Sequence, residues 1–100
     1  MNEIDFRIWL LKKETNKKVV SDLVSRLKRI EKEINHCDID CEYHSDKCEK
    51  LLSYFNKKGL NAQMDTIETL LPIGKYQLST YKYALKKYIA FLDEFTLNNR

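Results

Sequence analysis

The sequence feature that most constrains the fold is residues 17–34, KKVVSDLVSRLKRIEKEI. The apolar residues of this stretch recur at the i, i+3, i+4, i+7 spacing of an amphipathic α-helix. They form one stripe, made of Val20, Leu23, Val24, Leu27, Ile30 and Ile34. Polar and mostly basic residues lie on the opposite side at 100° per residue: Lys18, Asp22, Ser25, Arg29 and Lys32, flanked by Arg26 and Lys28. The stretch therefore predicts a helix with one buried face and one basic outer face.

Glu31 departs from this pattern, because it falls within the apolar stripe. A buried carboxylate needs a partner or must take up a proton. We therefore expect Glu31 to be partly exposed near the helix end, or to pair with a lysine or arginine of another helix.

Composition places the chain among folded all-α proteins. Of its 100 residues, 43% are hydrophobic and 33% charged, and it has two glycines and one proline, which favours long helices with few tight turns. No apolar run reaches the roughly 20 residues that span a bilayer, and the N-terminus lacks the positive region of a signal peptide. An odd number of cysteines, three, fits a reducing compartment. We predict one cytoplasmic domain.

Periodicity and capping residues predict a single small bundle of four to five helices. Asn16 is the expected N-cap of the helix over residues 17–34, and Ser45 that of a later helix. Asn61 is the expected cap of a less regular helix that ends before Pro72. The predicted helices cover residues 3–13, 17–34, 45–58, 62–70 and 76–96 of one domain, residues 1–100.

Cysteine and histidine gather in one polar segment, as Cys37-x3-Cys41-x2-His44-x3-Cys48. Thiolates and imidazoles at such short spacing could bind zinc tetrahedrally. However, the intervals differ from those of a zinc knuckle, and no glycine lets the chain turn tightly around a metal. Cys48 also lies on an apolar helix stripe, where a free cysteine behaves as a small hydrophobe. The preferred prediction is therefore a protein without metal or cofactor, with zinc as the lesser hypothesis.

Catalytic motifs are lacking in the sequence. The cysteines and histidines of the polar segment have no base, orienting residue or oxyanion site defined beside them, and no glycine-rich phosphate loop occurs. The sequence predicts a protein that is not an enzyme.

Two basic helix faces are candidates for contact with the phosphates of duplex DNA. Lysine and arginine neutralise phosphates, and serine and tyrosine can hydrogen-bond them. The alternative is that both faces are solvated helix surfaces without a ligand. If the two helices lie side by side, they could share one surface. The candidate residues are Ser25, Arg26, Lys28, Arg29 and Lys32 on one helix and Lys75, Tyr76, Ser79, Lys82, Tyr83, Lys86 and Lys87 on the other.

Several short motifs resemble one helical module. They are Phe6-x-x-Trp9-Leu10, the run from Val24 to Lys32, Asp38-Ile39-Asp40-x-x-Tyr43-x-x-Asp46, Leu51-Leu52, Pro72-Ile73, the run from Thr80 to Tyr88, and Phe91-Leu92. The module is similar to the SAM-like, core-binding domain of tyrosine recombinases, and is found at the N-termini of some restriction-type nucleases and phage proteins.

The resemblance implies a non-enzymatic DNA-binding module of a phage or other mobile element, which clamps duplex DNA through its helices. The catalytic domain of the recombinases has no counterpart in this sequence, so recombination by this chain alone is not implied. Residues 57–71 match the family pattern poorly, which leaves the path between the third and last helices undefined.

A second prediction is a small phage-type inhibitor or adaptor with an anti-defence role. Such a protein would bind a host defence nuclease or another protein partner. The expected contacts are Trp9, because tryptophan is frequent at interface hot spots, and the acidic residues Asp38, Asp40 and Asp46.

Overall fold

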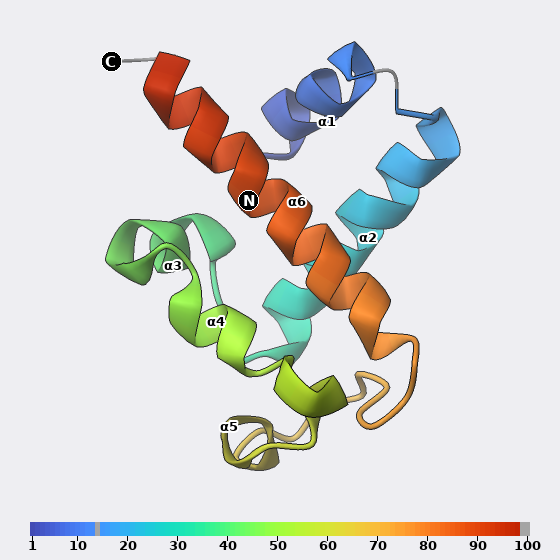
Figure 1. Cartoon of the computed structure of the whole chain (residues 1–100), viewed down its shortest axis with the longest axis vertical. Helices are drawn as coiled ribbons and strands as arrows, with labels where there is room; N and C mark the ends of the chain where they lie inside the picture. The colour runs from blue at the N-terminus through green and yellow to red at the C-terminus, as the bar shows by residue number, and fades with distance from the viewer. Residues whose placement is uncertain (14, 99–100) are drawn as a thin grey trace.

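The computed structural model describes residues 1–13 and 15–98. All regular secondary structure in these two ranges is helical (Figure 1), and this confirms the predicted all-α class. The described chain measures 37 × 30 × 20 Å, which fits a small helical bundle. Its elements are α1 (Glu3–Lys12), α2 (Lys17–Glu33), α3 (Ile39–Asp46), α4 (Glu49–Ser53), the 3-10 helix η1 (Asn56–Gly59), α5 (Ala62–Asp65) and α6 (Leu78–Asn98).

The two longest helices, α2 and α6, cross and pack against each other through their apolar faces (Figure 1). The predicted stripe of α2 is buried along its whole length: Val20, Leu23, Val24, Leu27, Ile30 and Ile34. The cap is also confirmed, since Asn16 Oδ1 accepts a hydrogen bond from the Lys18 N–H at 2.7 Å. Each buried aliphatic side chain stabilises the fold by about 1.5–3 kcal/mol, so this stripe organises the core.

Helix α1 packs against both α2 and α6 and supplies part of an aromatic cluster. Phe6 and Leu10 are fully buried, and the Phe6 ring lies 5.0 Å from the ring of Tyr88 and 5.5 Å from that of Phe91. Because α1 covers this flank of α6, the buried side of α6 includes Tyr88 and Phe91 as well as Leu85.

The predicted helix over residues 45–58 is wrong. Asp38, not Ser45, caps a helix that begins at Ile39, and its Oδ1 accepts a hydrogen bond from the Asp40 N–H at 3.0 Å. This helix ends at Asp46, because Lys47 and Cys48 both adopt left-handed backbone angles, with φ of 56° and 65°. The chain then continues as the short α4 and the 3-10 turn η1, so one predicted helix is three elements.

The predicted helix over residues 62–70 is also too long. Asn61 does cap it, with its Oδ1 accepting from the Met64 N–H at 2.8 Å, but the helix ends at Asp65. Beyond it, Glu33 of α2 accepts a hydrogen bond from the Leu70 N–H at 2.5 Å, which holds the following loop against α2. The last helix begins at Leu78 and ends at Asn98, two residues later at each end than predicted.

Gly59 is required where η1 meets the start of α6. Its φ is +83°, and a Cβ at this position would lie 2.8 Å from Leu78 Cδ2 and 3.0 Å from Ile73 Cδ1. Only glycine satisfies both the left-handed backbone and the close approach. Within residues 1–13 and 15–98, no helix is long and apolar enough to cross a membrane.

Candidate nucleic-acid interface

The basic face of α2 points outward, but other parts of the chain contact it. Lys28 Nζ lies 2.7 Å from Glu3 Oε1 of α1, and the Arg29 guanidinium donates to the Leu70 carbonyl at 3.3 Å. Of the predicted residues, Ser25, Lys28, Arg29 and Lys32 are exposed and Arg26 is half-buried. Two of the five predicted contacts on this helix therefore already have intramolecular partners.

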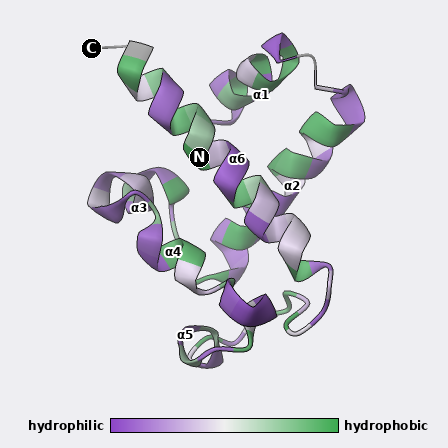
Figure 2. Cartoon of the chain, in the orientation of Figure 1, coloured by the Kyte–Doolittle hydropathy of each residue, from purple (hydrophilic) through white to green (hydrophobic). Residues whose placement is uncertain are grey.

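The basic face of α6 is joined by residues that sequence reasoning missed. Lys82 Nζ lies 3.4 Å from Asn56 Oδ1, and the Gly74 N–H donates to the Lys58 carbonyl at 2.7 Å. These contacts hold η1 beside the start of α6, and Figure 2 shows η1 as a hydrophilic segment. Lys57 and Lys58, both exposed, thus lie next to the predicted residues of α6. We call the combined set the η1–α6 surface: Lys57, Lys58, Lys75, Tyr76, Ser79, Lys82, Tyr83 and Lys86.

Lys87, also predicted for this face, lies elsewhere. Its Nζ is 5.8 Å from the centroid of the Trp9 ring, on the flank of α6 that α1 covers. An ammonium over an indole face is a cation–π contact, so Lys87 helps to hold α1 against α6. It is not part of the η1–α6 surface.

The basic faces of α2 and α6 do not form the single surface that the sequence suggested. Each helix packs its apolar stripe against the other, and its basic residues lie on the opposite side of its own axis. The two basic faces therefore point away from each other, on the outer sides of the packed pair.

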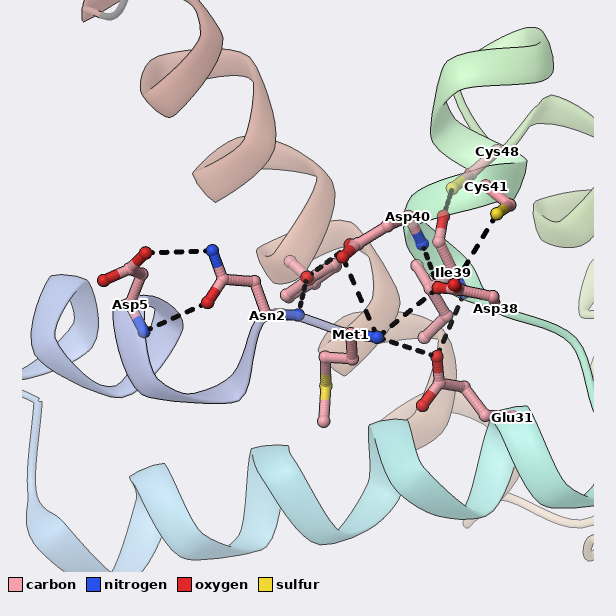
Figure 3. Close-up of polar contacts among 10 residues, drawn as sticks. Met1, Asn2, Asp5, Glu31, Asp38, Ile39, Asp40, Cys41 and Cys48 are labelled. Atoms are coloured by element: carbon pink, nitrogen blue, oxygen red, sulfur yellow. Dashed lines mark hydrogen bonds and ion pairs between the residues drawn. The ribbon is translucent and has the colours of Figure 1, made fainter.

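Glu31 is partly exposed near the end of α2, as expected, and it pairs with the N-terminus rather than with a lysine or arginine (Figure 3). Its Oε2 lies 3.2 Å from the Met1 ammonium and accepts the Ile39 N–H at 3.1 Å. The same ammonium lies 3.4 Å from Asp38 Oδ1 and 3.8 Å from Asp40 Oδ2. This N-terminal cluster, Met1 with Glu31, Asp38 and Asp40, ties the start of the chain to α2 and α3.

A buried tyrosine completes the N-terminal cluster from α6. The Tyr88 hydroxyl donates to Asp40 Oδ1 at 2.5 Å and accepts the Asn2 N–H at 2.6 Å. Burial, followed by the hydrogen bond to the Asp40 carboxylate, raises the pKa of Tyr88 strongly. The hydroxyl therefore stays protonated and acts as a fixed donor to Asp40.

The cluster also raises the pKa of the Met1 ammonium above its usual value. Burial acts to lower this pKa, but attraction to Glu31 and Asp40 and the hydrogen bond to Glu31 act in the opposite direction and outweigh it. The folded protein therefore holds this proton more tightly than the unfolded chain does.

Stability is expected to decline as the pH rises above about 8, where the unfolded amine begins to lose its proton. A raised folded-state pKa gives a contribution that is complete below the unfolded pKa and is lost as the pH rises through the folded pKa. Urea unfolding from pH 7 to pH 10 measures this decline. The thiols of Cys37 and Cys48 have pKa values raised to about 11 and about 12, so they also lower the stability of the fold as the pH rises. The Glu31→Ala variant is therefore the control: its profile should be flatter, and identical profiles would contradict the assignment.

The acidic residues predicted for a protein partner make contacts within the chain. Asp38 and Asp40 face the Met1 ammonium, and Asp46 accepts the Lys50 N–H at 3.0 Å. Trp9 is half-buried on α1, with Lys13 Nζ 5.3 Å from its ring centroid. The inhibitor or adaptor function stays a prediction.

The residues of the zinc hypothesis do not converge. Cys48 is fully buried and its Sγ lies 3.7 Å from the Ile39 carbonyl, whereas Cys41 and His44 are exposed. Burial raises the pKa of Cys37 and of Cys48, and the hydrogen bond to Asp38 raises that of Cys41. Since zinc needs thiolates, raised thiol pKa values work against binding. Within the described ranges, no three Cys, His, Asp or Glu side chains are placed to hold a metal ion.

Comparison of the chain with protein-family models, with curated proteins and with solved structures finds no match. The resemblance to the recombinase core-binding domain therefore stays a prediction that rests on the sequence motifs.

Proposed function

We propose that the protein is a non-enzymatic DNA-binding module that contacts phosphates through the η1–α6 surface. The observation that carries this proposal is the charge of the two segments that meet there. Residues 51–64 and 73–92 contain no aspartate or glutamate, and five of their six lysines belong to the η1–α6 surface, the exception being Lys87. By contrast, the basic face of α2 has acidic residues close by. Glu3 pairs with Lys28, and Glu33 accepts a hydrogen bond from the loop at Leu70. Unopposed positive charge is what attracts a polyanion.

Exposed hydroxyl groups and aromatic rings support the same ligand. Tyr76 and Tyr83 are 76% and 57% exposed, so their hydroxyls and ring faces are open to a ligand. Tyrosine hydroxyls donate hydrogen bonds to phosphate oxygens, and lysines neutralise the backbone. Contacts of this kind position a protein on the duplex without reading its sequence. We therefore assign the module to backbone binding with few base contacts.

The proposal includes the recombinase-type fold that the sequence motifs suggest. In that family, the SAM-like core-binding module holds duplex DNA through its helices, and such modules occur in phage and mobile-element proteins. The run from Thr80 to Tyr88, which is part of the resemblance, lies on α6 and carries Lys82, Tyr83 and Lys86. Helix α6, which contains this run, therefore contributes part of the η1–α6 surface.

A salt titration of DNA binding tests this proposal. Removing Lys57 and Lys58 together, as Lys57→Gln with Lys58→Gln, is expected to weaken duplex binding about tenfold near 0.1 M salt. The slope of log K against log salt should fall in magnitude by about 1–2, since each phosphate contact contributes roughly 0.9. Fluorescence anisotropy with a labelled duplex measures both quantities.

The matched control removes two charges from the other face, as Arg29→Gln with Lys32→Gln. This pair should change the affinity less than about twofold if the η1–α6 surface is the contact. If the control pair loses more affinity than the Lys57→Gln and Lys58→Gln pair, the DNA contact lies on α2 instead. No binding to duplex or single-stranded DNA at low salt would contradict the function itself.

A further inference from the structure

Helix α1 carries an apolar row on its outer side that the described chain covers only in part. Ile4 is 74% exposed, and Ile8 and Leu11 are each 47% exposed, while Phe6 and Leu10 on the other side fill the core. The three aliphatic residues are spaced i, i+4, i+7 and so form one line along the helix. Single exposed aliphatic residues are ordinary on a protein surface, but a continuous row on one helix marks a contact surface.

A groove runs beside this row, between α1 and the second half of α6. Its apolar lining includes Ile8, Trp9 and Phe95, so it extends the row toward α6. Asp5 and Lys12 of α1 line the same groove, as does Glu94 of α6, which is paired with Lys13 at 3.4 Å. The exposed surface of α1 is therefore apolar in the middle, with one acid and one base along a single flank.

We propose that a second copy of the chain covers this surface, with the two α1 helices antiparallel about a two-fold axis at Ile8. At a rise of about 1.5 Å per residue, Ile4 lies about 6 Å before Ile8, and Leu11 about 4.5 Å after it. An antiparallel pair therefore sets Ile4 against Leu11 of the second copy and Ile8 against its own symmetry mate. This arrangement is isologous, so one row covers the other.

Charge complementarity selects this occupant and this orientation. Asp5 lies three residues before Ile8, and Lys12 lies four residues after it, on the same flank of the helix. The two-fold axis therefore places Asp5 of each copy opposite Lys12 of the other, which gives two opposite-charge contacts. A parallel pairing would instead set this flank of each copy beside the opposite flank of the other, so Asp5 and Lys12 would not meet. On the other flank, Arg7 is neutralised by Glu3 at 2.9 Å.

The size of the surface sets the expected strength of the dimer. Helix α1 has 10 residues and is about 15 Å long, so it covers less than the roughly 800 Å² per partner of a stable complex. We expect a dissociation constant on the order of 10–100 μM. Sedimentation equilibrium of the full chain without DNA, from about 10 μM to 1 mM, covers this range, and it is independent of the proposed DNA binding.

The substitution Ile8→Glu is expected to raise the dissociation constant at least tenfold, because it places two carboxylates at the two-fold axis. Ile8 is partly exposed, so the fold should be kept, and circular dichroism checks this. The matched control is Leu70→Glu, at a residue that is 80% exposed in the loop before α6. A wild-type chain that stays monomeric at 1 mM, or equal effects of the two substitutions, would overturn the proposal.

A charge-exchange pair tests the orientation. Asp5→Lys alone and Lys12→Glu alone each create like-charge contacts at both ends, and each should weaken self-association several-fold. A 1:1 mixture of these two variants restores opposite charges at both contacts, so it should associate more tightly than either variant by itself. A mixture no tighter than the separate variants would exclude the antiparallel arrangement.

Discussion

Replacing Glu31 by alanine is expected to lower the free energy of unfolding by about 2–3 kcal/mol. The carboxylate accepts hydrogen bonds from the Met1 ammonium at 3.2 Å and from the Ile39 N–H at 3.1 Å. Its removal leaves the start of α3 without an acceptor and weakens the contacts of the ammonium. Because Asp38 and Asp40 remain near Met1, the loss is smaller than for a wholly unpaired buried charge. Urea unfolding at pH 7 measures the change.

Two further variants complete this test: one separates charge from hydrogen bonding at Glu31, and the other is a control at the next residue. Glu31→Gln keeps one oxygen acceptor and is expected to lose about half as much as the alanine variant. Lys32→Ala, at the next residue of the same helix and exposed, should lie within about 0.5 kcal/mol of the wild type. Equal stability of the Glu31→Ala and Lys32→Ala variants would show that the N-terminal cluster does not contribute.

Replacing Phe6 by alanine should lower the free energy of unfolding by about 4 kcal/mol, the largest effect we expect from one substitution. Phe6 has no exposed surface, and its ring lies 5.0 Å from that of Tyr88, 5.5 Å from Phe91 and 6.2 Å from Trp9. The loss combines the transfer of the ring from water with the cavity left among three aromatic side chains.

Thermal and urea unfolding of Phe6→Ala and Phe6→Leu test this effect. Leucine fills part of the space and should lose roughly 1–2 kcal/mol. Leu70→Ala, which truncates a side chain that is 80% exposed, is the control and should change the stability by less than about 0.5 kcal/mol. A loss below about 1.5 kcal/mol for Phe6→Ala would mean that α1 is not firmly packed on α6.

The sequence predicts α2 well because its period is regular and its burial is one-sided. Six apolar residues at helical spacing and the Asn16 cap are local signals, and the structure buries the whole stripe and uses the cap. The same reasoning fails for residues 45–58. Cys48, Leu51 and Phe55 are buried, as their spacing suggests, yet the backbone of Lys47 and Cys48 turns left-handed between α3 and α4. Burial at helical spacing therefore does not guarantee a continuous helix.

For the candidate site as well, the sequence predicted some of the residues and missed others. Sequence patterns identified Lys75, just before α6, and Lys82 and Lys86 on it, but they placed Lys57 and Lys58 only at the end of the predicted helix over residues 45–58. The signal that could have included them is the absence of any acidic residue from residues 51–64 and 73–92. The proximity of Lys57 and Lys58 to α6 depends on the hydrogen bond from Gly74 to Lys58 and on the close approach of Gly59 to Leu78. Both are contacts between segments that are well separated in the sequence.

The sequence by itself determined the helical class, the buried face of α2 and the basic character of the outer faces, because periodicity and charge are properties of single segments. Only the tertiary structure decided how these faces are combined. Packing α2 against α6 turns their basic sides apart, places η1 beside α6, and brings the Met1 ammonium to Glu31. The physical reason is that each of these relations depends on contacts between distant segments, and burial of apolar surface across the whole chain selects those contacts.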